Sequence, residues 1–170
     1  MTTEGAPSGH PWDWIYATRA MDSVGWFEPD PVNSRDLIGR AVAHGARSII
    51  DIGGGASRLV DHLLGLSLDP DLGLDRIAVL DISEAALASA RHRLGPEAEK
   101  VTWIVGDVAE IDDVGEFDIW HDRAAFHFLL DPAAQQRYAR LAERTVPIGG
   151  IAIIATFAED GPGRCSGMPI

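Results

Sequence analysis

The sequence predicts a single α/β domain in which a doubly wound parallel sheet carries helices on both faces. Five short runs rich in branched apolar residues recur along the chain without strict alternation, which is typical of strands buried on both faces. Amphipathic helical patterns separate these runs, and such alternation builds right-handed units around a parallel sheet. The 170 residues suffice for one domain with a buried core.

The expected elements follow in chain order. The five strands are expected at residues 48–52, 76–81, 101–105, 117–121 and 150–156. The spacing of apolar residues predicts helices over 34–44, 57–66 and 84–94, and a fourth that opens at Pro132. Ser83 and Asp131 are the expected N-caps of the last two helices, because their side chains can accept hydrogen bonds from the first helical N–H groups.

These elements divide the chain into three parts and a tail. Residues 11–45 are expected to form an N-terminal helical cap, 46–158 a ligand-binding core and 159–170 a C-terminal loop. Residues 1–10 are expected to be a disordered tail. We expect all three parts to belong to one domain.

Composition bears on partners and compartment. The net charge of −12 would repel a phosphate backbone at long range, so no nucleic-acid partner is expected. Cys165 is the single cysteine, which excludes an internal disulfide framework and fits a reducing compartment. The start of the chain lacks the pattern of a signal peptide, and no run approaches the roughly 18 apolar residues of a membrane span. We therefore expect a cytoplasmic protein with no membrane partner.

A glycine-rich turn, "DIGGGAS" over residues 51–57, follows the first expected strand. Ligands of open α/β sheets bind at this edge, and glycine lets the backbone approach a ligand closely. A purely structural turn is the alternative. The dinucleotide fingerprint matches poorly, because Arg58 stands where its third glycine would be and Asp51 would lie near the diphosphate. The carboxylate suits a cationic ligand better.

Asp51-x-Gly53-x-Gly55 resembles motif I of the class I, Rossmann-like S-adenosylmethionine-dependent methyltransferases. Two further acids, in "VLDIS" and "VGDV", match the family positions that bind the ribose hydroxyls and the adenine amino group, and "VPIGG" over 146–150 resembles its Pro-x-Gly-Gly turn. Ser57 departs from a third glycine that many members have. The resemblance implies the strand order 3-2-1-4-5 and S-adenosyl-L-methionine as cofactor. The implied binding residues are Asp51, Gly53, Gly54, Gly55, Ser57, Asp81, Ile82, Asp107, Val108 and His121, with no metal.

The N-terminal segment is rich in aromatic residues. Trp12 and Tyr16, followed by Trp26, Phe27 and Pro31, resemble the N-terminal cap of a small bacterial subgroup of the same family. The resemblance implies that Tyr16 and Trp26 cover the cofactor, where aromatic faces would attract a sulfonium. Packing into the core is the alternative.

The segment "WHDRAAFHFLLDP", over residues 120–132, would lie near the transferred methyl group in this family. His121 and Asp122 are the candidate catalytic residues, as general bases for a nucleophile that arrives protonated. The alternatives are that Asp122 caps the chain locally or pairs with Arg123, and that His127 packs into the core. Cys165 would follow the fifth strand near the substrate pocket, or be an inert thiol.

We expect a methyltransferase that acts by direct displacement on a thiol, oxygen or nitrogen nucleophile of a small-molecule substrate. The alternatives are a non-catalytic S-adenosylmethionine-binding module, a protein lysine methyltransferase and an NAD-dependent oxidoreductase. No residue decides the methyl acceptor.

The family's sheet has seven strands and ends in an antiparallel hairpin after the fifth. This sequence stops at Ile170, so we expect that hairpin to be missing, whether the chain is a fragment or a natural short form. The unpaired fifth strand would be an edge prone to association. We expect a second chain, in a homodimer, or residues 157–170 to cover it.

Overall fold

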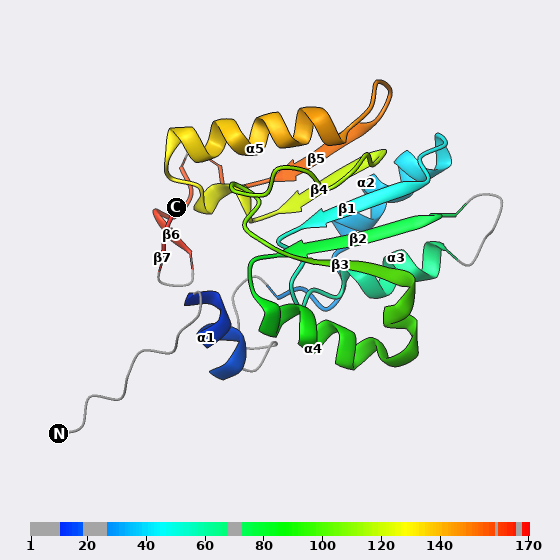
Figure 1. Ribbon diagram of the computed structural model, residues 1–170, viewed down its shortest axis with the longest axis horizontal. Coiled ribbons are helices and arrows are strands. Elements are labelled where there is room, and N and C mark those ends of the chain that lie inside the picture. Colours follow the sequence, from blue (N-terminus) through cyan, green and yellow to red (C-terminus); the bar gives the residue numbers. More distant parts are fainter. Residues whose placement is uncertain (1–10, 19–26, 68–72, 159, 166–167) are drawn as a thin grey trace.

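A computed structural model describes residues 11–18, 27–67, 73–158, 160–165 and 168–170. Figure 1 shows a five-stranded sheet in the order β3-β2-β1-β4-β5. All four pairings within the sheet are parallel, which confirms the predicted fold class and strand order. The strands are β1 (Ser48–Ile52), β2 (Arg76–Asp81), β3 (Val101–Val105), β4 (Ile119–Arg123) and β5 (Ile151–Ala155).

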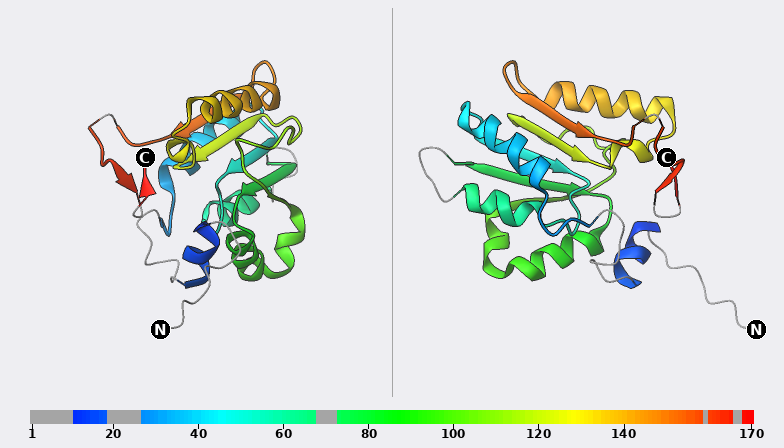
Figure 2. Two further views of the ribbon diagram at one scale, coloured as in Figure 1. Left: turned by 60° about the vertical axis from the view of Figure 1, so that its left-hand side comes forward. Right: turned by 180° about the vertical axis from the view of Figure 1, so that it is seen from behind.

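Helices cover both faces of the sheet. They are α1 (Pro11–Thr18), α2 (Val32–Ala43), α3 (Leu59–Leu66), α4 (Glu84–Leu94) and α5 (Pro132–Thr145), with 3-10 turns η2 (Gly95–Lys100) and η3 (Phe126–Phe128). One core cluster joins α2, α3 and α4 to Ile49, Ile77 and Ile119 of the sheet, and the other joins α5 to Ile50 and Trp120. The two views of Figure 2 show α2 and α5 on opposite sides of the strands.

Both predicted N-caps are present. The hydroxyl of Ser83 accepts a hydrogen bond from the N–H of Ala86, and the carboxylate of Asp131 accepts one from the N–H of Ala133. Strands β1, β2 and β3 and helix α4 have the predicted bounds. The helices predicted at 34–44 and 57–66 are found at Val32–Ala43 and Leu59–Leu66.

The fourth strand corrects the prediction. It was expected at 117–121 but runs over Ile119–Arg123. The carboxylate of Asp118 accepts hydrogen bonds from the N–H groups of Arg47 and Ser48, at 2.8 and 2.9 Å, so it ties the strand start to the segment before β1. As a consequence Asp122, which was expected just after the strand, lies inside it together with His121.

The C-terminal segment is also different from the prediction. Instead of a loop over 159–170, a short antiparallel hairpin forms from β6 (Arg164–Cys165) and β7 (Met168–Pro169). This hairpin pairs with no strand of the main sheet, and no described strand pairs with the outer edge of β5. The expectation that residues 157–170 cover that edge is therefore not met by strand pairing. None of the described helices is long and apolar enough to cross a membrane.

Candidate active site

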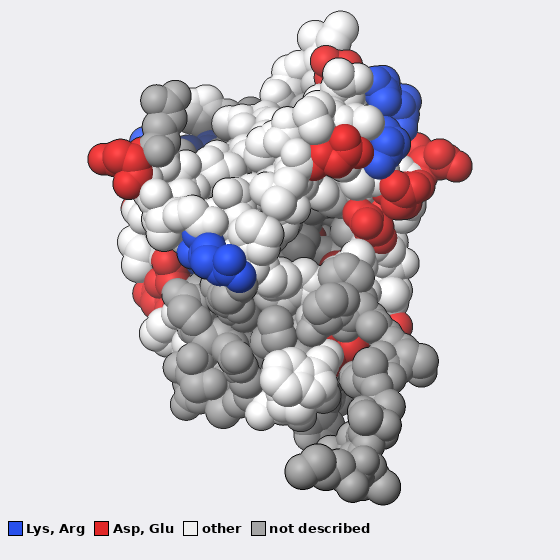
Figure 3. All heavy atoms as spheres, turned by 90° about the vertical axis from the view of Figure 1, so that its left-hand side faces the viewer, with Lys and Arg blue, Asp and Glu red and all other residues white. Residues whose placement is uncertain are grey.

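Three carboxylates meet at the carboxyl edge of the sheet. Asp51 lies in β1, Asp81 is the last residue of β2 and Asp107 follows β3 by two residues. Because the strands are parallel, their ends face the same side of the molecule. Figure 3 looks onto this edge and shows a hollow near its centre, with atoms of acidic residues inside.

Two adjoining hollows lie at this edge. The larger cavity has a volume of about 380 Å³, within the range of about 300–1,000 Å³ that is usual for ligand sites. It is lined by the predicted binding residues Tyr16, Gly53, Asp81, Ile82, Asp107 and Val108. The smaller hollow, of about 30 Å³, has room for about one water and is lined by Asp51, Gly54, Ser57 and His121. Tyr16, Ile52, Gly53 and Arg123 line both.

The glycine loop is packed so tightly that side chains there would collide with the acids. A Cβ at Gly54 would lie 2.8 Å from Cγ1 of Val79 and closer still to the carboxylate of Asp51. A Cβ at Gly55 would lie 2.8 Å from Oδ2 of Asp81. Gly55 also has φ +45°, a conformation that other residues rarely adopt. Glycine is therefore required to keep the backbone against the carboxylates.

Asp81 is almost fully buried, with 5% of its surface exposed. Its Oδ1 accepts a hydrogen bond from the N–H of Ser83 at 2.8 Å. Burial raises the pKa of Asp81 to about 6, and the carboxylates of Asp51 and Asp13 add to this effect, while the N–H groups of Ser83 and Gly55 oppose it. A buried carboxylate at a cavity wall is ready to accept hydrogen bonds from a ligand that brings hydroxyl groups.

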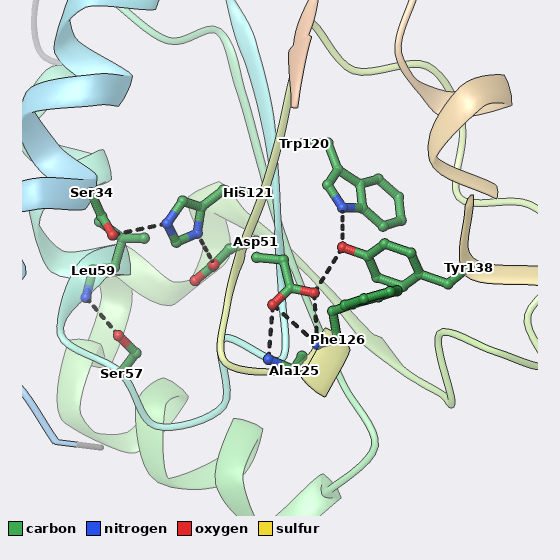
Figure 4. A network of polar contacts seen from close by, with 10 residues as sticks. Ser34, Asp51, Ser57, Leu59, Trp120, His121, Ala125, Phe126 and Tyr138 are labelled. Atoms are coloured by element: carbon green, nitrogen blue, oxygen red, sulfur yellow. Dashed lines mark hydrogen bonds and ion pairs between the residues drawn. The ribbon is translucent and has the colours of Figure 1, made fainter. Parts of the chain in front are cut away.

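Asp51 and His121 form a buried pair across β1 and β4. Nδ1 of His121 lies 2.6 Å from Oδ1 of Asp51, and Nε2 lies 2.9 Å from Oγ of Ser34 on α2 (Figure 4). Because a carboxylate only accepts, Nδ1–H donates to Asp51. Ser34 is not among the described residues that line either hollow, so this Ser-His-Asp series does not present a serine nucleophile.

Asp122 belongs to a different network, on the opposite face of β4. Its carboxylate accepts hydrogen bonds from the N–H groups of Ala125 and Phe126, at 2.8 and 3.1 Å, and from the hydroxyl of Tyr138 at 2.8 Å (Figure 4). The indole N–H of Trp120 donates to the same hydroxyl at 2.8 Å. Burial raises the pKa of Asp122 to about 6, although the N–H of Ala125 and the Tyr138 hydroxyl lower it.

This geometry agrees with local capping by Asp122, one of the two alternatives to catalysis. Asp122 is not among the described residues that line the two hollows, whereas His121 lines the smaller one. A general base at Asp122 would first have to release its present donors. The catalytic roles of both residues stay predictions.

The N-terminal helix packs over the cavity. Trp12 and Tyr16 of α1 line it, and Ser83 at the start of α4 donates a hydrogen bond to Oδ1 of Asp13 at 2.6 Å. The Tyr16 hydroxyl lies 3.0 Å from where a Cβ on Gly55 would be. Trp26, the other predicted cap residue, lies outside the described residues.

Two further sequence candidates, His127 and Cys165, differ in their relation to the larger cavity. His127 packs between Phe128 and Phe157, its ring nitrogens have no described hydrogen-bond partner, and burial lowers its pKa. Cys165 lines the larger cavity together with Met168 and Pro169 of the hairpin. Among the described residues, no cluster of three or more His, Cys, Asp or Glu side chains could hold a metal ion.

Sequence reasoning missed one wall residue of particular interest, Arg123. It was considered only as a possible ion-pair partner of Asp122, yet the two side chains leave β4 on opposite faces. Alternation along the strand places Arg123 on the same face as His121, and this would have been visible with the correct strand bounds. Met168 and Pro169 of the hairpin were missed as cavity lining because the last segment was expected to be a loop, whereas Cys165 was expected near the pocket.

Comparison with known proteins agrees with this geometry. A family model described as a methyltransferase domain matches residues 49–150, more than half of the chain. No protein of curated function matches the sequence. The chain belongs to the class I, Rossmann-like S-adenosylmethionine-dependent methyltransferase family.

Solved structures of similar fold are longer than this chain. A sugar N-methyltransferase from Streptoalloteichus has a TM-score of 0.63 and 22% identity over 94% of this chain and 59% of its own. An amino pentose methyltransferase from Micromonospora echinaspora, involved in calicheamicin biosynthesis, has a TM-score of 0.59 and 18% identity over 93% and 61%. An S-adenosylmethionine-dependent methyltransferase from Clostridium acetobutylicum has a TM-score of 0.62 and 17% identity over 84% and 55%. The chain thus spans about three fifths of their length.

Proposed function

We propose that this chain is an S-adenosylmethionine-dependent methyltransferase that acts on a small molecule by direct displacement. The observation that carries the proposal is the convergence of Asp51, Asp81 and Asp107 on two adjoining hollows around the glycine loop. Two of these carboxylates are buried, which is costly unless a ligand or hydrogen bonds compensate them. The same arrangement disfavours a dinucleotide, whose diphosphate would lie against them.

The residues present fit this cofactor. The close packing of Gly54 and Gly55 against the acids leaves backbone, rather than side chains, facing the ligand. Asp51 would hold the ammonium group, Asp81 the ribose hydroxyls, and Asp107 with Val108 the adenine ring. When bound, S-adenosylmethionine supplies an electrophilic methyl group on a sulfonium centre. Carboxylates nearby favour that positive charge.

The chain's own contribution to catalysis would be placement and proton removal. Holding a nucleophile in line with the methyl group can lower a barrier by roughly 7–11 kcal/mol. The apolar wall formed by Phe128, Leu129 and Leu130 would exclude water from the larger cavity. His121 would accept a proton from the nucleophile only by exchanging one of its two present hydrogen bonds. The acceptor is proposed as a thiol, amine or hydroxyl of a small molecule.

Calorimetry with S-adenosylmethionine, S-adenosylhomocysteine and NAD tests the cofactor, and turnover of labelled methyl donor with thiol, amine and alcohol acceptors tests the reaction. Asp81→Ala should weaken S-adenosylhomocysteine binding by about 1–3 kcal/mol, since its partners would lose their acceptor. Asp36→Asn, on the exposed side of α2, is the matched control and should bind normally. Binding of NAD without S-adenosylhomocysteine would overturn the proposal, and binding without turnover would favour a non-catalytic module.

We also propose that a second copy of the chain covers the outer edge of β5. Ile151 and Ile154 of this strand are 42% and 46% exposed. Residues 145–158 contain no charged side chain, so two copies of a chain with net charge −12 can approach there without direct repulsion. A monomer in analytical ultracentrifugation, with fast amide exchange over 150–156, would contradict this. We propose the cytoplasm as the compartment, because a single cysteine suits reducing conditions.

A further inference from the structure

The amino-acid end of S-adenosylmethionine carries two opposite charges, an ammonium and a carboxylate. The acids at the sheet edge can account for the ammonium, but a buried carboxylate also needs a cationic or hydrogen-bonding partner. Among the described residues lining the two hollows, one has a permanently cationic side chain, and it lines both of them: Arg123. We propose that Arg123 binds the α-carboxylate of the methyl donor and so makes the site specific for an intact amino acid. This inference rests on the proposed function.

Strand geometry places Arg123 appropriately for this role. Side chains alternate along a strand, so residues 121 and 123 leave β4 on one face, about 6.6 Å apart along the strand. His121 is opposite Asp51 in the register of β1 and β4. Arg123 therefore lies one step further toward the carboxyl edge than the Asp51–His121 pair. A ligand whose ammonium meets Asp51 would carry its carboxylate within reach of the next cationic group at that edge.

The backbone around Arg123 is held firmly. Arg123 is opposite Ala155 in the β4–β5 register, and the N–H of Ala124 donates to the carbonyl of Ala155 at 2.9 Å. The chain turns sharply at Ala124, which has φ +73°. Immediately beyond, the carboxylate of Asp122 accepts from the N–H groups of Ala125 and Phe126. These contacts fix the position of the backbone from which the Arg123 side chain extends.

The present surroundings of Arg123 already include an anionic group. Oε1 of Glu28 lies 3.8 Å from its guanidinium, and the Arg123 side chain is 23% exposed. The Glu28 side chain is 49% exposed, so water can solvate its carboxylate if the ligand displaces it. A guanidinium has five N–H donors, so the ligand can also bind beside Glu28 rather than replace it. In the first case Glu28 competes with the ligand carboxylate, and in the second the two carboxylates share the guanidinium.

The test compares two ligands that differ only in the carboxylate: S-adenosylhomocysteine and decarboxylated S-adenosylhomocysteine. Calorimetry of the unsubstituted chain should show a preference of about 10- to 100-fold for the first ligand, as expected for a charge-assisted hydrogen bond. In Arg123→Gln this preference should shrink to less than about threefold, because only the carboxylate-bearing ligand loses affinity. The readout is binding, so it does not depend on knowing the methyl acceptor.

Two further variants complete the experiment. Arg144→Gln removes a positive charge on α5 that lines neither hollow among the described residues, and it should retain the full preference. Glu28→Gln removes the competing carboxylate, so the preference should be retained or increased. It also keeps the test valid if Arg123→Gln does not fold, since a loss of preference in Glu28→Gln would overturn the assignment.

The outcomes separate this inference from the proposed function. If the unsubstituted chain binds both ligands and Arg123→Gln keeps the preference, or weakens both ligands equally, the role of Arg123 is wrong while the proposed function stands. If the unsubstituted chain binds neither ligand, the proposed function is wrong and the assignment fails with it.

Discussion

The two polar networks on either side of β4 are built from neighbouring residues but connect to different parts of the molecule. His121 reaches across to Asp51 and Ser34, beside the smaller hollow. Asp122 turns to the other face, where its carboxylate accepts bonds from Tyr138 and from the backbone after the strand. The first network therefore orients His121 and Asp51 at the smaller hollow. The second fixes the backbone that follows β4.

The difference shows why two adjacent residues that could both act as general bases need not share a role. Both were expected as general bases, because histidine as a residue type titrates near neutrality and a carboxylate can be tuned by its surroundings. The alternation of side chains along a strand separates them by the thickness of the sheet. We therefore expect substitutions in the Asp122 network to change stability, and substitution of Asp51 in the His121 network to change ligand affinity.

The largest effect is expected for Asp122→Ala. This change leaves the Tyr138 hydroxyl and the N–H groups of Ala125 and Phe126 buried without their acceptor, and each such group costs about 1–3 kcal/mol. The free energy of unfolding in urea should fall by about 3 kcal/mol or more. The protein that remains folded should bind S-adenosylhomocysteine with unchanged affinity. Normal stability with lost affinity would contradict the division between the two networks.

The pH dependence of stability should report the same carboxyl group. Its pKa is about 6 when folded and 3.8 when unfolded, so between these values the folded state binds the proton more tightly. The free energy of unfolding should therefore fall by up to about 3 kcal/mol as pH rises from about 4 to 6. Asp122→Asn should lack this contribution, as seen by comparing urea titrations across this range. Identical pH profiles for the two proteins would argue against an unusually weak acid at this position.

A smaller effect, on binding rather than stability, is expected for Asp51→Asn. The amide keeps the shape of the side chain but removes the negative charge at the smaller hollow. Affinity for S-adenosylhomocysteine should fall by about 1–3 kcal/mol, which is the range for losing a hydrogen bond to a charged group. Calorimetry would measure this, with Asp36→Asn as control. An unchanged dissociation constant would remove Asp51 from the ligand site.

The smallest effect is expected for Ser34→Ala. Among the described residues its hydroxyl bonds to Nε2 of His121, and loss of this bond should cost about 1 kcal/mol of stability. Ligand affinity should change less than in Asp51→Asn, because His121 keeps its bond to that carboxylate. Thermal unfolding and calorimetry together would show this order. A larger loss of affinity in Ser34→Ala would mean that the ring orientation of His121 controls binding.

Most of the fold was predictable because its signals are local. The apolar runs and the caps at Ser83 and Asp131 located the strands and most helices within two residues. The start of β4 was not predictable in this way. It depends on hydrogen bonds from Arg47 and Ser48 to Asp118, about 70 positions away in the chain. Such long-range contacts leave no periodic pattern in the sequence.

The carboxyl-edge site is predictable in outline from the sequence. Glycines between a buried strand and a helix, and an acid at or just after the end of each of three successive strands, must converge wherever those strands are parallel and adjacent. Tertiary structure alone decided how the side chains divide between two faces of β4. It directs the Asp122 side chain to Tyr138, away from the cavity, and places His121 beside Asp51. It also brings Arg123 and the C-terminal hairpin to the cavity. This follows from where β4 begins and ends. A shift of its bounds by two residues leaves the apolar pattern nearly the same but changes which side chains lie at the edge of the sheet.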